Sequence, residues 1–305
     1  MQALDAFQLE LGRASEWGMA LTLALMMFSV ALGLRAEHFT FFKTAPRLYV
    51  TGVIAQLLFL PAATLLLCFA VKPSPTVALG MILIACCPGG NVSNLLVLLA
   101  RGNTALSVSL TATSSLAAAF ITPVSIIFWS ALYPPTRALL SEIEFDALNF
   151  LLQTSVILAV PLMCGMAVAH WLPRAASRLQ RPLVMLASAG LLFIIVSTTW
   201  RYLDQFALVG IAFYALIVSH NAMAFVLGYG CARAVRADAR SLRALTFEVG
   251  IQNSGLGIVI LLTQLGGMGG AAAVAGLWGI WHIVAGLLLV ALWRWLDRHR
   301  GIHAV

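Results

Sequence analysis

The chain has 305 residues, of which 61% are hydrophobic and only 10% are charged. A soluble domain carries roughly a quarter charged residues, so the composition excludes a soluble globular protein and predicts an all-α integral membrane protein. The formal net charge is +7. Because the cations lie between hydrophobic runs without interleaved aromatic residues, they favour a role in membrane topology over nucleic-acid binding.

Nine hydrophobic runs approach or exceed the twenty or so residues that a spanning helix needs. Helix breakers and charged residues separate them. Acidic and basic residues are mixed into the first sixteen positions, so we expect no cleavable signal peptide and a retained first run. The predicted spans are residues 17–34, 47–70, 76–100, 103–132, 148–171, 182–200, 206–231, 243–266 and 271–296.

The cations divide unevenly between the two sides that nine spans define. This bias predicts an N-terminus outside and a C-terminus in the cytoplasm, in a plasma or inner membrane. The richer side holds Arg35, Lys43, Arg47, Arg101, Arg174, Arg178, Arg181, Arg233, Arg236, Arg240, Arg243, Arg294, Arg298 and Arg300. The poorer side holds Arg13, Lys72, Arg137 and Arg201.

Two of the spans are interrupted by clusters of small and amide residues. Residues 87–94 read Cys-Pro-Gly-Gly-Asn-Val-Ser-Asn, and residues 248–255 read Glu-Val-Gly-Ile-Gln-Asn-Ser-Gly. Irregular backbone is tolerated at membrane depth only where it is buried in protein or lines a cavity. A pair of such interruptions in one polytopic chain predicts a transporter.

Glu248 is a carboxylate inside a predicted span, where an ionisable group usually marks an ion or substrate path. It must be protonated, paired with a cation or bound to a metal ion. Neighbouring spans contain no Lys or Arg, so Na⁺ or a proton is the natural partner. The alternative is a side chain that reaches the cytoplasmic interface near Arg243.

Further oxygens come from the second, third and fourth spans. Ser107 and Thr111 are four residues apart, which places both hydroxyls on one helical face, able to bind a common ion. The alternative is a structural role: such hydroxyls also donate to a carbonyl of the preceding helical turn or bridge two helices. The buried Gln56 amide could likewise form a hydrogen bond between helices. The candidate side chains are Gln56, Ser93, Asn94, Ser107, Thr111 and Thr113.

Four ordered motifs resemble the bile acid:sodium symporters, also called the sodium/bile acid cotransporter or BASS family. The resemblance runs from the first span to the last. It implies an inverted-repeat transporter with a panel domain, a core domain and two crossed discontinuous helices. The motifs are Gly-Val-Ile-Ala-Gln at 52–56, Cys-Cys-Pro-Gly-Gly-Asn-Val-Ser-Asn at 86–94, Ala-Arg-Gly-Asn-Thr-Ala-Leu-Ser-Val at 100–108 and Glu-Val-Gly-Ile-Gln-Asn-Ser-Gly-Leu at 248–256.

By this resemblance, residues 1–305 form a single polytopic membrane domain with nine transmembrane helices, as in the mammalian members. The panel would comprise spans 17–34, 148–171 and 182–200. The core would comprise spans 47–70, 76–100, 103–132, 206–231, 243–266 and 271–296.

The resemblance also implies two Na⁺ sites that share one carboxylate. Every side chain that the family uses is present in this chain. The first site would use Ser93, Asn94, Ser107, Thr111 and Glu248. The second would use Gln56, Glu248 and Gln252 with backbone oxygens of Val249 and Ile251.

The substrate would lie in the crevice between core and panel, near Asn91, Asn253 and His282. The chain departs from the family here: Ile283 follows His282 where bacterial relatives often carry Asn, and Asn91 replaces a small hydroxyl residue. Either change would alter hydrogen bonding to a carboxylate. His282 could equally be a structural residue, and the same holds for His220 and Asn221.

The motifs and the family resemblance together predict sodium-coupled symport of an organic anion by alternating access, with Na⁺ as coupling ion and no cofactor. The anion could be bile-acid-like, steroid-like, or a small keto or hydroxy acid such as pantoate. Alternatives are a sodium-independent exporter or uniporter, and a channel or membrane-embedded sensor. An enzyme is not expected, because the chain has neither a Gly-x-Ser-x-Gly elbow nor a His-Glu-x-x-His pair.

Overall fold

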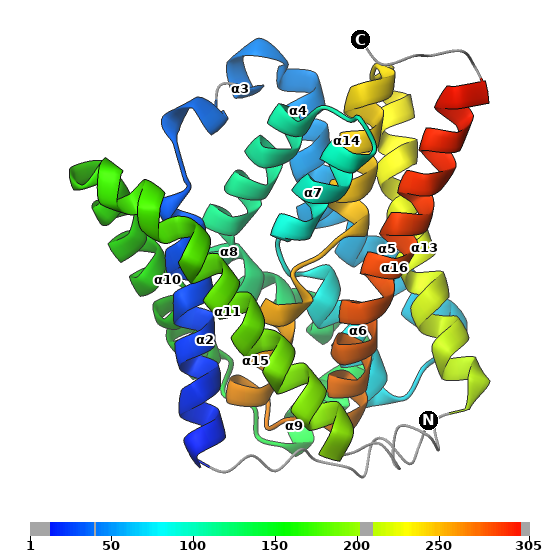
Figure 1. Cartoon of the computed structure of the whole chain (residues 1–305). Helices are drawn as coiled ribbons and strands as arrows, with labels where there is room; N and C mark the ends of the chain where they lie inside the picture. The colour runs from blue at the N-terminus through cyan, green and yellow to red at the C-terminus, as the bar shows by residue number, and fades with distance from the viewer. Residues whose placement is uncertain (1–12, 40, 202–209, 300–305) are drawn as a thin grey trace.

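The computed structural model describes residues 13–39, 41–201 and 210–299, and within these ranges all regular elements are helices (Figure 1). They are α2 (Arg13–Leu32), η1 (Ala36–Phe39), α3 (Phe41–Thr44), α4 (Pro46–Ile54), η2 (Ala55–Phe59), α5 (Leu60–Val71), α6 (Pro75–Ala85), α7 (Asn91–Leu99), α8 (Thr104–Leu132), α9 (Pro134–Glu142), α10 (Ala147–Trp171), α11 (Pro173–Arg201), α13 (Ile211–Ala234), α14 (Ala239–Gly250), α15 (Ser254–Gln264) and α16 (Gly269–His299).

Five helical segments of the described chain are long and apolar enough to cross a membrane: Pro46–Val71, α8, α10, α13 and α16. Shorter apolar helices are Trp17–Leu32, α6 and α15. The chain is therefore a multi-pass, all-helical membrane protein. The count of nine spans and the orientation of the termini stay predictions.

The two predicted interruptions are present as gaps between helices. α6 ends at Ala85 and α7 begins at Asn91, while α14 ends at Gly250 and α15 begins at Ser254. Half-helices α6 and α15 are buried on almost every side: residues 76–85 and 254–262 are all buried. A helix that is apolar all round belongs in a core, and these two lie among the other helices in the lower half of Figure 1.

Helices α2, α10 and α11 pack on one another and lie on one side of the molecule (Figure 1). α2 also contacts α15, and α10 contacts α8, so this group borders the interrupted helices. The group contains the three spans predicted for a panel. The division into panel and core itself stays a prediction.

Three local features differ from the sequence expectation. The segment after Tyr133 forms the short helix α9, and α11 begins at Pro173 rather than near Pro182. Proline is favoured at the first position of a helix, which suits both starts. Residues 55–59 form a π-helical turn. Pro61 has no N–H and its ring crowds the preceding turn, so the helix widens before it.

Close packing at glycine holds α6 against α16. A Cβ on Gly80 would lie 2.7 Å from the Ala271 Cα atom and 2.9 Å from its carbonyl oxygen, whereas a Cβ on Gly276 of α16 would meet nothing within 4 Å. Small residues let membrane helices approach closely. Gly80 therefore fixes the distance between the two backbones.

We predict that Gly80→Ala lowers the thermal stability of the purified protein, because overpacking a close contact costs about 1–3 kcal/mol. Gly276→Ala is the matched control and should leave the melting temperature unchanged or slightly raised, since alanine is the better helix former. A thermal-unfolding measurement in detergent compares them. Equal melting temperatures for the two variants would contradict the packing account.

Candidate functional site

The two interruptions meet and pair through their backbones. Gly89 and Gln252 form an isolated antiparallel bridge, and the Asn253 N–H donates to the Pro88 carbonyl at 2.8 Å. This pairing satisfies backbone groups that hydrocarbon could not. Gly89 leaves room for the polar side chains at the crossing, because a Cβ there would lie 2.9 Å from both the Gln56 Nε2 and Glu248 Oε2 atoms and would displace them.

Four helix ends converge on this crossing. The carboxyl ends of α6 and α14 carry partial negative charge, and the amino ends of α7 and α15 carry partial positive charge. The Asn253 side chain caps α15 by accepting from the Leu256 N–H at 3.0 Å. The crossing can therefore stabilise a cation at one pair of ends and an anion at the other.

Glu248 lies in the last turn of α14 and is fully buried. Its carboxylate accepts from the Ser93 and Ser107 hydroxyls, each at 2.5 Å, and from the Thr111 hydroxyl at 3.0 and 2.9 Å. The three donors come from α7 and α8, so three different helices build the cluster.

The cluster has more oxygen acceptors than hydroxyl protons. The Ser107 hydroxyl also lies 2.7 Å from the Asn94 Oδ1 atom, and the Ser93 hydroxyl lies 2.8 Å from the Gly90 carbonyl oxygen. A hydroxyl has one proton and can serve one acceptor at a time. Such a surplus of lone pairs around a buried carboxylate suits a bound cation. In the described residues no group of three or more His, Cys, Asp or Glu is found, so the oxygen set favours a hard cation over a transition metal.

Two glutamine amides adjoin the carboxyl end of α14. Gln56, in the π-helical turn, and Gln252 both donate to the Glu248 carbonyl oxygen, at 3.2 and 3.4 Å. Gln252 also donates to the Val249 carbonyl oxygen at 2.8 Å. Its own Oε1 atom is buried and has no hydrogen-bond partner within the described chain. Ile251, the next residue after α14, is buried and extended.

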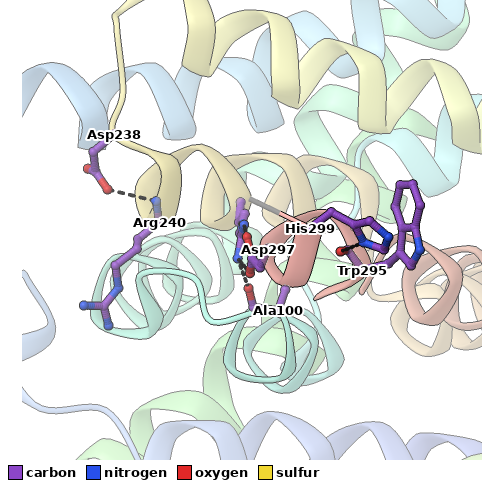
Figure 2. Close-up of polar contacts among 7 residues, drawn as sticks. Ala100, Asp238, Arg240, Trp295, Asp297 and His299 are labelled. Carbon is purple, nitrogen blue, oxygen red and sulfur yellow. Dashed lines mark hydrogen bonds and ion pairs between the residues drawn. The ribbon is translucent and has the colours of Figure 1, made fainter. Parts of the chain in front are cut away.

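Arg243 does not neutralise Glu248. Its guanidinium pairs with the Asp297 carboxylate at 2.5 Å and donates to the Ala100 carbonyl at 2.6 Å. Figure 2 shows Asp297 and Ala100 beside one another. No ion pair of Glu248 with a basic residue is found in the described part of the chain. Glu248 is fully buried, so the alternative in which it reaches the interface near Arg243 does not hold.

The beginning of α14 is fixed separately from its end. The Asp238 carboxylate accepts from the Arg240 N–H at 2.9 Å (Figure 2). It also accepts from the Ser241 N–H at 3.1 Å. Arg243, one turn further on, ties α14 to the end of α16 through Asp297. These contacts hold the helix that carries Glu248.

The predicted substrate residues come from three helix segments, and two of their side chains are described. Asn253 is half-buried, and its Nδ2 atom lies 3.5 Å from the Met26 Sδ atom of α2. His282 is buried on α16, where its Nδ1 atom lies 2.5 Å from the Trp278 carbonyl oxygen of its own helix. α7 begins at Asn91, whose side chain lies outside the described part of the structure. Their role as substrate contacts stays a prediction.

A cavity of about 420 Å³ lies between α2, α8 and α11 and reaches the polar cluster. Its walls include Asn94 and Thr111 at one end and His38, Gln180 and Arg181 at the other. A separate cavity of about 510 Å³ between α2, α10 and α15 is lined by Trp17, Leu23 and Gln264 and includes none of the clustered oxygens. The cluster therefore borders the cavity between α2, α8 and α11.

The sequence did not predict the contacts that two hydroxyl residues of α8, Thr113 and Ser114, make. Thr113 does not join the cluster, because its hydroxyl donates to the Ser109 carbonyl at 2.8 Å and contacts the Tyr49 hydroxyl. Ser114 accepts from the Gly89 N–H at 3.2 Å and so supports the crossing. The helical spacing from Ser107 through Thr111 to Ser114 is the signal that could have identified it.

A buried carboxylate at two crossed, interrupted helices defines a membrane transporter. The model of the Sodium Bile acid symporter family matches residues 20–208. An uncharacterized sodium-dependent transporter, YocS, of Bacillus subtilis is 28% identical over 271 residues, covering 89% of this chain and 81% of the relative. A probable chloroplastic sodium/metabolite cotransporter, BASS1, of Oryza sativa is 30% identical, covering 83% and 61%. The ileal sodium/bile acid cotransporter of Homo sapiens is 26% identical, covering 78% and 67%.

The chain belongs to the sodium bile acid symporter family. This confirms the resemblance drawn from the four motifs. The family consists of sodium-dependent transporters, so Na⁺ is the coupling ion that membership implies. The aligned region spans about three-fifths of the rice relative and about four-fifths of the bacterial one.

We predict that Na⁺ raises the melting temperature of the purified protein by several degrees relative to K⁺, since a ligand that binds only the folded state stabilises it. Ser107→Ala should remove most of this increment, because it deletes a hydroxyl at the carboxylate. Ser109→Ala is the matched control, as its buried hydroxyl bonds only within its own helix, to the Ala105 carbonyl at 2.8 Å. Equal sodium-dependent shifts in both variants would contradict the cluster as the sodium site.

Proposed function

We propose that this protein is a sodium-coupled symporter of an organic anion that works by alternating access, with two Na⁺ bound at the helix crossover. The observation that carries the proposal is the fully buried Glu248 carboxylate, held by three hydroxyls and without a basic partner among the described residues. A buried carboxylate of this kind needs a cation or a proton.

The first Na⁺ would take its ligands from the polar cluster. Hard monovalent cations prefer several oxygen ligands, and the cluster supplies carboxylate, hydroxyl and amide oxygens on three helices. Binding there would replace hydroxyl donors at the carboxylate with the ion, and it would tie α7, α8 and α14 together. The ligands would be Ser93, Asn94, Ser107, Thr111 and Glu248.

The second Na⁺ would lie at the carboxyl end of α14, with Glu248 shared between the two ions. Gln252 now presents an N–H group to the Val249 carbonyl oxygen that the ion would use, and Gln56 presents one to the Glu248 carbonyl oxygen beside it. Their amides would rotate so that oxygens face the ion, and the unpartnered Oε1 atom of Gln252 supports this. Val249 and Ile251 would contribute backbone oxygens.

Two Na⁺ and one carboxylate leave a net positive charge, which suits an accompanying anion. The amino ends of α7 and α15 add favourable dipoles for its carboxylate or sulfonate. The 420 Å³ cavity supports this, because its described lining includes Arg181 and no acidic side chain. We expect Asn253, His282 and Asn91 to contact the anion, which would be bile-acid-like, steroid-like, or a small acid such as pantoate.

Alternating access would move a core of the remaining helices against a panel of α2, α10 and α11. We place the protein in the plasma membrane. If it has nine spans and an external N-terminus, its arginine-rich loops face the cytoplasm. The sodium gradient and a negative-inside potential would then drive import, each net charge moved contributing about 2.3 kcal/mol per 100 mV.

We predict that Glu248→Gln abolishes sodium-stimulated uptake while leaving the protein folded, because the amide keeps the shape but removes the charge that binds the ions. Proteoliposomes with an inward Na⁺ or K⁺ gradient measure uptake of a labelled bile acid and of pantoate. Glu142→Gln, at an exposed position at the end of α9, is the control and should transport normally. Sodium-stimulated uptake by Glu248→Gln would overturn the proposal, and equal uptake in Na⁺ and K⁺ by the unaltered protein would favour a sodium-independent carrier.

A further inference from the structure

Three successive carbonyl groups at the carboxyl end of α14 accept hydrogen bonds from side-chain amides. A helix leaves its last carbonyl groups without intrahelical partners. The Phe247 carbonyl still accepts a helical bond, from the Ile251 N–H at 2.9 Å. The Glu248 and Val249 carbonyls accept from glutamine amides. The Gly250 carbonyl accepts from the Asn221 Nδ2 atom of α13 at 2.8 Å.

Asn221 differs from the two glutamines in one respect that matters for ion binding. Gln56 and Gln252 are proposed ligands, so they must release the Glu248 and Val249 carbonyls when the second Na⁺ enters. Asn221 is not a proposed ligand, and its bond to Gly250 can persist. It is therefore the side chain that can hold the end of α14 in place while the carbonyls beside it turn to the ion.

Close backbone contact puts Asn221 within reach of Gly250. A Cβ on Gly228 of α13 would lie 2.7 Å from the Leu245 carbonyl oxygen, and a Cβ on Gly250 would lie 2.1 Å from the Phe225 ring. The two glycines let α13 and α14 approach at one face. Ile251, the next residue, leaves the helix in an extended conformation, with φ −117° and ψ 106°. Because the Gly250 carbonyl and the Ile251 N–H belong to one rigid peptide plane, holding the Gly250 oxygen toward α13 fixes the plane that lies between the Val249 and Ile251 carbonyls.

The burial of Asn221 argues against a purely stabilising role. The side chain is fully buried, and its Oδ1 atom has no hydrogen-bond partner among the residues described. A buried polar atom left unpaired is unfavourable, and an apolar side chain of the same size would avoid that loss. Exceptions to the rule that buried polar atoms are hydrogen-bonded are commonly found at functional sites.

We infer that Asn221 is a positioning residue of the second sodium site, acting through its hydrogen bond to the Gly250 carbonyl to orient the backbone oxygens of Val249 and Ile251. The inference rests on the proposed function. Asn221 sets the affinity of the second ion without contacting it. It leaves the first ion largely unaffected, because four of the five ligands of that ion are side chains of α7 and α8 and the fifth is the Glu248 side chain, which Asn221 does not contact.

The test is equilibrium binding of ²²Na⁺ to the purified full-length protein. The unaltered protein should bind two ions per chain. Asn221→Leu, which keeps the size but removes the donor, should retain one ion near its original affinity. The other should bind at least about tenfold more weakly, and each factor of ten corresponds to about 1.4 kcal/mol. A melting curve of each protein in K⁺ reports stability separately.

Thr64→Val is the matched control. Thr64 is buried on α5, and its hydroxyl lies 2.8 Å from the Nε2 atom of His220, the neighbour of Asn221. This substitution removes a buried hydrogen bond to the same turn of α13 but leaves the bond to Gly250 in place, so it should lower stability and leave both sodium affinities unchanged. If Asn221→Leu does not fold, Asn221→Ser, whose side chain is too short for the same direct bond, replaces it with the same expected weakening.

Two sodium ions bound at unaltered affinity by the folded Asn221 variant would overturn the inference and leave the symporter proposal intact. A sodium affinity lowered as much by Thr64→Val would also overturn it, because the effect would then follow general disruption of α13. Failure of the unaltered protein to bind ²²Na⁺ is a different result: it would overturn the proposed function itself.

Discussion

The burial of one carboxylate constrains the rest of this structure. Glu248 has no contact with solvent, and the nearest candidate base, Arg243, is paired with Asp297. Removing an unpaired charge from water costs far more than a protein's net stability can absorb, so the group must be neutralised by a proton or a cation. The hydroxyls of Ser93, Ser107 and Thr111 contribute hydrogen bonds but no positive charge. A bound Na⁺ would supply that charge and join three helices in one contact.

The interruptions in the helices also help to neutralise the buried carboxylate. Breaks at Gly89–Gly90 and Ile251–Asn253 release carbonyl oxygens at the carboxyl ends of α6 and α14, where the helix dipole favours a cation, and turn the amino ends of α7 and α15 toward the same region. The backbone bridge between Gly89 and Gln252 keeps the exposed amides satisfied. Because the ions would hold the two interrupted helices together, occupancy of the sodium sites and the shape of the anion site become linked.

Much of this could be predicted from sequence, because hydropathy and helix breakers are local signals. The apolar runs located the helices, and Pro88-Gly89-Gly90 located one interruption. The gathering of Ser93, Ser107 and Thr111 around Glu248 followed from helical spacing and from the family resemblance. The partners that depend on tertiary packing did not follow. Asn221 meets Gly250 only because Gly228 lets α13 approach α14, and the π-helical turn at Gln56 depends on how the chain relaxes before Pro61. No periodicity encodes these contacts.

The most direct test of the account is a high-resolution crystal structure determined in NaCl and again in KCl. The account predicts density for an ion in NaCl between the Glu248 carboxylate and the Ser93, Ser107, Thr111 and Asn94 oxygens, with contacts shorter than the O–H···O distance of about 2.7–2.8 Å. It also predicts a second ion beside the Val249 and Ile251 carbonyls, with the Gln252 amide turned. A carboxylate that keeps the same hydroxyl bonds in both salts, with no ion density at concentrations that support transport, would contradict it.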